Sequence, residues 1–197
     1  MSEATENAKA VFLDRDGVIN PLVYNPVTLV YESPNSPDDF EVYPYVKKSL
    51  ELLKLSGYKT IVVSNQPSFA KGKATWENIK EIERKLYDFS VGNGCLLDDY
   101  YYCYHHPEGI VPEYSIVCKC RKPGTLLPEQ AVNKYDLDKS LCYFIGDSDT
   151  DIMCGKAMGF VTVRIGSERP VSNSGAVAPD MFASDLYKAV LDIVNRR

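Results

Sequence analysis

The stretch Ala10-Val11-Phe12-Leu13-Asp14-Arg15-Asp16-Gly17 changes abruptly from apolar to acidic residues. Four apolar residues bounded by polar ones are typical of a buried strand, here ending at Asp14. Asp14 and Asp16 are two positions apart, so in an extended chain their side chains lie on the same side. Gly17 then allows a tight turn and a close approach of another group to the backbone. We therefore expect both carboxylates to follow a buried strand.

The same alternation continues along the chain, with short apolar runs separated by longer segments of helical periodicity. Strands are predicted at residues 10–13, 60–63, 98–103, 142–145 and 162–165, and helices at 44–56, 75–89, 126–135, 149–158 and 186–194. This order favours an α/β fold, a doubly wound parallel sheet with helices on both faces. Residues 21–43 are predicted to form a long ordered loop. The remaining gaps are too short for a cap domain, and we expect one domain over residues 1–197.

Composition excludes several classes of function. The 27 acidic residues outnumber the 22 basic ones, and the net charge of −5 disfavours a broad surface for nucleic acid or anionic membrane. No apolar run approaches the ~18 residues of a membrane span. The first six residues lack the basic and apolar regions of a secretion signal. We therefore expect a cytoplasmic monomer with reduced cysteines.

Polar side chains follow three of the predicted strands. Asp14, Ser64 and Asp147 come at strand ends, and the carboxyl ends of parallel strands form the edge where such sheets bind ligands. The segment Asp147-Ser148-Asp149-Thr150-Asp151 adds further carboxylates, although Asp149 is equally well explained as a helix-capping residue. Clustered carboxylates repel one another, and Mg²⁺, which prefers oxygen ligands, would relieve this repulsion. With the Lys122 cation, the site could stabilise a transferring phosphoryl group.

The order Asp-x-Asp-Gly, Ser-Asn, Lys and Gly-Asp-x-x-x-Asp resembles the haloacid dehalogenase-like phosphatase superfamily over residues 10 to about 165. The resemblance implies that Asp14 is the nucleophile and that Asp16 is the general acid and then the general base. It implies that Ser64 and Lys122 hold the phosphoryl group. The implied Mg²⁺ ligands are Asp14, the backbone carbonyl of Asp16, and Asp147. Asp151 would orient these groups or, alternatively, bind the ion directly.

Cysteines supply a second candidate metal site. The pattern C-x-H-x12-C-x-C provides three thiolates and one imidazole, a normal ligand set for structural Zn²⁺, within a loop over residues 103–120. The expected ligands are Cys103, His105, Cys118 and Cys120. His106 competes with His105, and the family resemblance favours His105. Cys95, Cys142 and Cys154 lack such partners and are interpreted as bystanders.

This loop narrows the resemblance to one branch. Cys-x-His-His-Pro followed by Cys-x-Cys-Arg-Lys-Pro is similar to the heptose-bisphosphate and histidinol-phosphate phosphatases. The resemblance implies removal of the C7 phosphate from a heptose 1,7-bisphosphate. Histidinol phosphate or another small phosphorylated sugar is the alternative. It also implies that Arg121 recognises substrate, and we expect Asn65 to contact substrate. Lys71, Lys73, Arg121 and Lys122 could form a second anionic subsite.

Two unrelated classes of protein share some of these features. A signalling receiver domain also combines acidic residues, a hydroxyl and a lysine on a doubly wound sheet. Its acidic pair precedes a phosphate-accepting Asp on a later strand, whereas here the candidate nucleophile lies on the first strand. A zinc-dependent nucleic-acid module is disfavoured by the negative charge and by the lack of a basic stripe.

Overall fold

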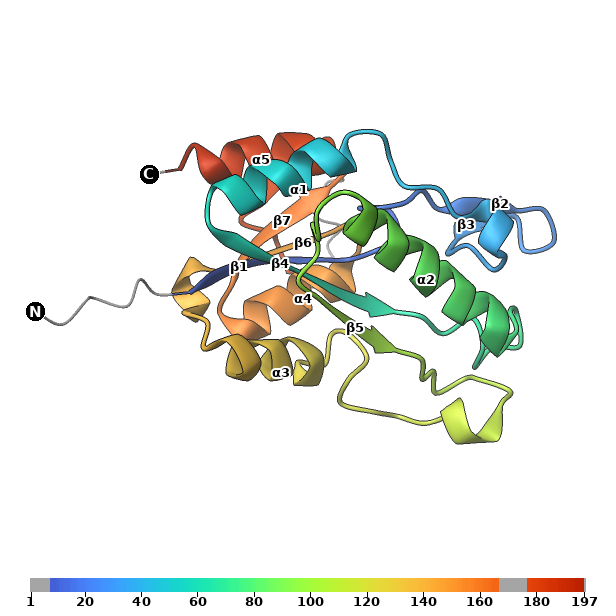
Figure 1. The fold of residues 1–197 in the computed structure, drawn as a ribbon. Coiled ribbons are helices and arrows are strands. Elements are labelled where there is room, and N and C mark those ends of the chain that lie inside the picture. The colour runs from blue at the N-terminus through green and yellow to red at the C-terminus, as the bar shows by residue number, and fades with distance from the viewer. Residues whose placement is uncertain (1–7, 167–176, 197) are drawn as a thin grey trace, which may run out of the picture.

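The computed structural model describes residues 8–166 and 177–196, and its centre is a six-stranded parallel sheet (Figure 1). The strand order is β5-β4-β1-β6-β7-β8. The strands are β1 (Lys9–Leu13), β4 (Tyr58–Asn65), β5 (Asp99–Cys103), β6 (Tyr143–Gly146), β7 (Val161–Ile165) and β8 (Met181–Ala183). The helices are α1 (Val46–Leu55), α2 (Trp76–Gly92), α3 (Leu126–Tyr135), α4 (Asp149–Met158) and α5 (Leu186–Val194).

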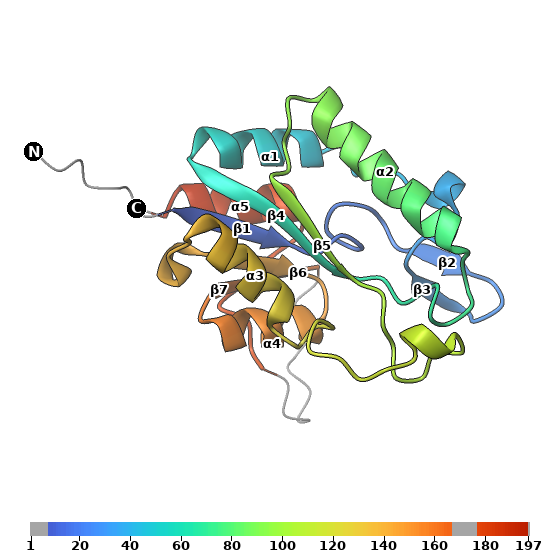
Figure 2. The same cartoon turned by 60° about the horizontal axis from the view of Figure 1, so that its bottom comes forward.

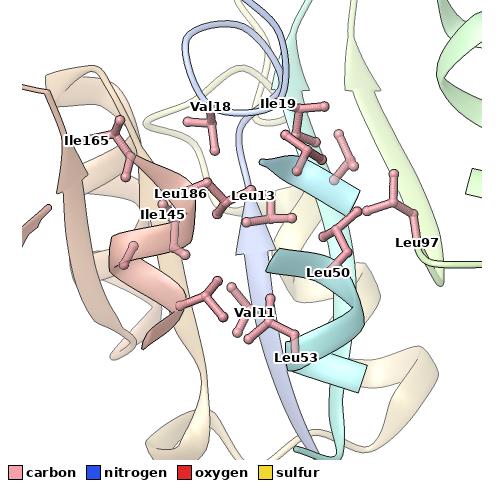
Figure 3. Packing of buried hydrophobic residues seen from close by; sticks show 14 of the residues in the cluster. Val11, Leu13, Val18, Ile19, Leu50, Leu53, Leu97, Ile145, Ile165 and Leu186 are labelled. Atoms are coloured by element: carbon pink, nitrogen blue, oxygen red, sulfur yellow. The ribbon is translucent and has the colours of Figure 1, made fainter. Parts of the chain in front are cut away.

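Helices cover both faces of the sheet, as expected for a doubly wound fold (Figure 2). Side chains alternate along β1, so Val11 and Leu13 join the core with α1, α2 and α5, whereas Ala10 and Phe12 join the core with α3 and α4. Figure 3 shows the first of these cores around Leu13. The central strand is therefore buried on both faces, which accounts for its continuous apolar run.

Three helices, α3, α4 and α5, have the bounds predicted from the sequence, and Thr75 caps α2 by accepting a hydrogen bond from the Asn78 amide at 3.1 Å. The prediction of a long ordered loop at 21–43 was wrong in part. This segment contains an antiparallel pair, β2 (Val23–Asn25) and β3 (Val30–Glu32), and a short 3-10 helix, Pro37–Asp39. The Asn25 side chain accepts hydrogen bonds from the amides of Val27 and Thr28, which closes the turn between the strands.

Strand β8 and two further 3-10 helices, Pro112–Tyr114 and Lys139–Leu141, were also not predicted. Strand β8 has only three residues, too few for a periodic signal. It is positioned by Asp180, whose carboxylate accepts hydrogen bonds from the Thr162 amide and hydroxyl at 2.8 and 2.9 Å. Among the described residues, no helix is both long and apolar enough to cross a bilayer. The single-domain organisation stays a prediction.

The sheet order brings the candidate residues to one edge. Strand β1 lies between β4 and β6, with Leu13 in register with Val62 and with Ile145. The residues that follow these strands, including Asp14 and Asp147, therefore meet at the carboxyl end of the sheet, where parallel sheets bind ligands.

Candidate active site and zinc site

A buried ammonium group joins the candidate nucleophile to a second carboxylate. The Lys122 Nζ atom lies 2.9 Å from Asp14 Oδ1 and 2.6 Å from Asp151 Oδ1, and the Lys122 side chain is 1% exposed. The Ser64 hydroxyl donates a hydrogen bond of 2.6 Å to Asp14 Oδ1. The Arg15 backbone amide also donates to Asp14 Oδ1, at 2.7 Å. This oxygen is therefore held by three groups, and the other oxygen is free of the Ser64 and Lys122 contacts.

The charged groups in this cluster shift one another's pKa values. Burial, followed by the charge of Asp151, raises the pKa of the Asp14 carboxyl to about 7, although Lys122 lowers it. Burial and Asp151 likewise raise the pKa of Asp147 to about 6. Burial lowers the pKa of the Lys122 ammonium, but Asp14 and Asp151 outweigh this effect and hold it above its usual value. The cluster contains more negative charge than Lys122 alone compensates.

A metal ion would supply the missing positive charge. Carboxylate oxygens of Asp14, Asp147 and Asp151 all lie within 4.8 Å of one another. Oxygen donors in such a group fit Mg²⁺, which carboxylates bind together with water and phosphate oxygens. The Asp16 carboxylate is outside this group, so its expected contribution remains its backbone carbonyl. Asp151 has the contacts of an orienting residue, because its Oδ2 accepts hydrogen bonds from the Ser148 amide and hydroxyl.

The turn after β1 depends on Gly17. Its φ is +80°, and a Cβ at this position would lie 2.1 Å from Asp147 Oδ2. Only glycine therefore allows the backbone after Asp16 to approach the Asp147 carboxylate so closely.

Hydrogen-bond donors from several side chains surround the Asp16 carboxylate. Arg15 donates to Oδ1 through Nε at 3.1 Å and Nη2 at 3.0 Å, Asn20 donates to Oδ1 at 2.9 Å, and Gln66 donates to Oδ2 at 2.7 Å. The Ser33 side chain also hydrogen-bonds to Asp16. Burial raises the pKa of Asp16, but Arg15 and the other donors outweigh burial and hold it below its usual value.

Two side chains next to Ser64 have contacts that the sequence did not indicate. Gln66 is fully buried, and its Nε2 reaches both Asp16 Oδ2 and, at 3.1 Å, Ser64 Oγ. Sequence reasoning missed Gln66, and its position two residues after Ser64 was the available signal. Asn65 exchanges two hydrogen bonds with the Lys122 backbone, at 2.9 and 3.2 Å. We therefore assign Asn65 to positioning Lys122, and its expected contact with substrate stays a prediction.

The three thiols and the imidazole expected to bind zinc converge. The Cys103, Cys118 and Cys120 Sγ atoms lie 3.2–3.6 Å apart, and His105 Nδ1 lies 3.3 Å from Cys120 Sγ and 3.8 Å from Cys103 Sγ. Sulfurs bound to one tetrahedral zinc at about 2.3 Å would be about 3.8 Å apart, whereas a disulfide needs about 2.05 Å. The group fits a structural zinc ion with no open position. His105, rather than His106, belongs to it.

Basic side chains surround the outer rim beside the zinc site. Arg121 donates to the backbone oxygen of His105 at 3.4 Å. Burial, followed by Arg121 and Lys73, lowers the pKa of Lys71, and burial, followed by Lys71 and Arg121, lowers the pKa of His106. Two members of the predicted anionic subsite have other partners: Lys73 pairs with Glu32, and Lys122 pairs with Asp14 and Asp151. The structure leaves Lys71 and Arg121 as the candidates for that subsite.

The substitution Gly17→Ala tests the close approach to Asp147. We expect Mg²⁺ affinity, measured by titration calorimetry, to fall about 10- to 100-fold because the new Cβ displaces the Asp147 carboxylate. Gly159→Ala is the matched control, since its φ is +78° but a Cβ there would meet nothing within 4 Å. Equal Mg²⁺ affinity in the two variants would contradict this account.

The zinc site makes a separate prediction. Elemental analysis should find about one zinc per chain, and Cys118→Ser should lose it and lower Tm by about 5 °C or more, because metal binding stabilises the loop that it closes. Cys95→Ser is the control, because Cys95 is an exposed free thiol outside the group. Retention of zinc by Cys118→Ser would refute the ligand set.

Comparisons with known proteins identify the relatives of this chain. Residues 119–189 match the HAD-hydrolase-like family. The D-glycero-D-manno-heptose-1,7-bisphosphate 7-phosphatase of Chlorobaculum tepidum is 31% identical over 193 residues, covering 94% of each chain. The D-glycero-beta-D-manno-heptose-1,7-bisphosphate 7-phosphatase of Yersinia pestis is 33% identical, covering 94% of this chain and 97% of that protein.

Solved structures show the same fold. The D,D-heptose 1,7-bisphosphate phosphatase of B. bronchiseptica, crystallised with magnesium and phosphate, superposes with a TM-score of 0.77 at 21% identity. The match covers 96% of this chain and 99% of that one, so the shared fold includes nearly all of both proteins. Because the Chlorobaculum and Yersinia relatives are 31% and 33% identical over 94% of this chain, the chain belongs to the haloacid dehalogenase-like phosphatase family.

Proposed function

We propose that this protein is a Mg²⁺-dependent phosphatase that removes the C7 phosphate of D-glycero-D-manno-heptose 1,7-bisphosphate. The observation that carries the proposal is the convergence of Asp14, Ser64 and Lys122 beside an acidic group that fits Mg²⁺. The near full-length relatives with this activity support the choice of substrate. We also infer that the enzyme is a cytoplasmic monomer, as the sequence predicts.

The first step transfers the phosphoryl group to the enzyme. The Asp14 carboxylate attacks phosphorus and the bond from phosphorus to the leaving oxygen breaks. Asp16, which becomes protonated when the negative charge of the bound phosphate raises its pKa, gives its proton to that oxygen. The products of this step are the free alcohol, an aspartyl phosphate at Asp14 and an ionised Asp16.

The second step restores the enzyme. The Asp16 carboxylate takes a proton from a water molecule as the water oxygen bonds to phosphorus and the bond between phosphorus and Asp14 breaks. Inorganic phosphate leaves, and Asp16 is protonated again. Throughout both steps, Ser64 and Lys122 face the phosphoryl oxygens, while Asn65 holds the Lys122 backbone in place. Asp14, Asp147 and the Asp16 carbonyl would hold Mg²⁺, which would supply charge stabilisation for the phosphoryl oxygens.

A bisphosphate suits the charge at the rim. Burial, followed by the charges of Arg121 and Lys73, lowers the pKa of Lys71, and Glu108 and Glu32 offset this only in part, so positive charge prevails beside the zinc loop. A second phosphate group would balance that charge, and arginine matches phosphate through paired N–H donors. A cavity of about 740 Å³, lined in part by Gly17, Tyr31, Tyr43 and Asp147, opens at the same edge and provides room for a small organic group.

The substitution Asp14→Asn tests the covalent step. Phosphate release from heptose 1,7-bisphosphate should fall by more than about 10³-fold, because the amide cannot form an aspartyl phosphate. Asp88→Asn, on α2, is the control and should keep its activity, since that side chain is exposed and pairs with Arg84 away from the site. Turnover of Asp14→Asn at the normal rate would exclude the mechanism.

A substrate panel tests the bisphosphate preference. We expect a higher kcat/KM for heptose 1,7-bisphosphate than for histidinol phosphate, and the reverse order would favour the alternative substrate. Arg121→Ala and Lys71→Ala should lower kcat/KM for the bisphosphate about 10- to 100-fold, the worth of one charged hydrogen bond, and change an aryl phosphate much less. Lys119→Ala, an exposed residue of the same loop, is the control. Equal losses on both substrates would exclude the anionic subsite.

A further inference from the structure

Arg15 is the largest of the fully buried side chains, and nothing in the mechanism above uses it. Burying a guanidinium is costly unless its charge is paired and its N–H groups are hydrogen-bonded. Its partner is the adjacent Asp16, which it contacts through Nε and Nη2. Among the described residues, the buried Nη1 has no hydrogen-bond partner, so the guanidinium commits its bonded donors to one carboxylate.

The two oxygens of Asp16 are held unequally. Oδ1 accepts three hydrogen bonds of 2.9–3.1 Å, two from Arg15 and one from Asn20, which saturates its lone pairs. Oδ2 accepts two hydrogen bonds, from Gln66 at 2.7 Å and from Arg15 Nη2 at 3.2 Å. Protonation of Oδ1 would displace both Arg15 donors and Asn20, whereas protonation of Oδ2 would displace the longer Arg15 contact and turn the Gln66 amide. Oδ2 is therefore the oxygen that carries a proton at the smaller loss of hydrogen bonds.

Gln66 links this oxygen to the nucleophile. Its Nε2 lies between Asp16 Oδ2 and Ser64 Oγ, and the Ser64 hydroxyl in turn donates to Asp14 Oδ1. The buried Oε1 atom of Gln66 has no partner among the described residues. Rotation of this amide would exchange a donor for an acceptor, so the same side chain can face either the ionised or the protonated form of Asp16.

We propose that Arg15 is a positioning residue. Its Nε and Nη2 atoms hold Asp16 Oδ1, so that Oδ2, adjacent to Gln66, is the oxygen that delivers the proton to the leaving group. The Phe40 ring, 5.8 Å from the Arg15 guanidinium, packs beside it. The inference rests on the proposed function, because it presupposes that Asp16 is the general acid.

Leaving-group dependence separates positioning from a merely structural role. An alkyl leaving group such as the heptose needs a proton to depart, whereas 4-nitrophenolate leaves without one. In Arg15→Met, the first-turnover rate measured by rapid mixing should fall about 100-fold on heptose 1,7-bisphosphate, within the range for loss of general acid catalysis. The first-turnover release of 4-nitrophenol from 4-nitrophenyl phosphate should stay within about threefold of the wild type. First-turnover rates exclude the hydrolysis step, in which Asp16 also acts.

Two further variants keep the test independent of folding. Arg15→Lys retains the buried positive charge but lacks the fork of two donors. Its first-turnover rate should therefore also fall much further on heptose 1,7-bisphosphate than on 4-nitrophenyl phosphate. Gln66→Met removes the second contact while leaving the Arg15 ion pair, and should show a smaller difference between the two substrates. Thr60→Val is the control for lost stability, since Thr60 is a buried hydroxyl bonded to Leu96 and Asp98 away from the site. It should affect both substrates equally.

The outcomes distinguish the inference from the function on which it rests. If Asp16→Asn slows the first turnover of heptose 1,7-bisphosphate much more than that of 4-nitrophenyl phosphate, Asp16 remains the acid. If the Arg15 variants then slow both substrates equally, positioning by Arg15 is overturned. If Asp16→Asn slows both substrates equally, both the acid role and the inference fail. Full rescue by Arg15→Lys would also overturn the inference, because charge alone would then suffice.

Discussion

The site is built around the buried Lys122 ammonium. It contacts carboxylates from two different parts of the chain, Asp14 after β1 and Asp151 in α4, and it donates to the Val63 carbonyl of β4 at 2.7 Å. Three segments therefore meet at one charge. Removing one partner from such a buried group typically costs about 3–5 kcal/mol, because the charges left behind are neither hydrated nor paired. The catalytic arrangement and the stability of this edge of the sheet thus depend on the same contact.

The position of Lys122 depends in turn on the zinc loop. Lys122 follows Cys120 by two residues, and the Asn65 amide holds its backbone from the side of β4. The loop has few buried apolar side chains: Tyr114 packs against Phe69 and Trp76, but Ile110 is 73% exposed and Val117 is 88% exposed. Four ligands closing on one ion compensate for that missing core. A zinc ion with no part in the proposed chemistry would therefore help to hold the cation that we assign to it.

Much of this arrangement could be predicted because it follows from the topology. Residues such as Asp14 and Asp147 follow strands that a parallel sheet must align, and thiolate spacing identifies a zinc site without knowledge of the fold. The surroundings of Asp16 could not be predicted, because they depend on tertiary contacts. Nothing in the Asp-Arg-Asp sequence indicates that Arg15 turns inward to pair with Asp16, or that Gln66 reaches Asp16 from the position just after β4. Strand β8 and the β2-β3 pair are too short to produce a periodic pattern, and their order comes from hydrogen bonds made by side chains such as Asn25 and Asp180.

The segment at residues 21–43 has a task that a cap domain would otherwise perform. Ser33 hydrogen-bonds to Asp16, the preceding Glu32 pairs with Lys73, and Tyr31 lines the cavity next to Asp147. Three neighbouring residues thus reach the acid, the basic rim and the cavity. The zinc loop contributes Arg121 beside Lys71, a residue of the loop after β4. Because these segments, rather than the strands, contact Asp16, the basic rim and the cavity, changes in them can alter the substrate while the proposed Asp14 and Lys122 chemistry stays the same.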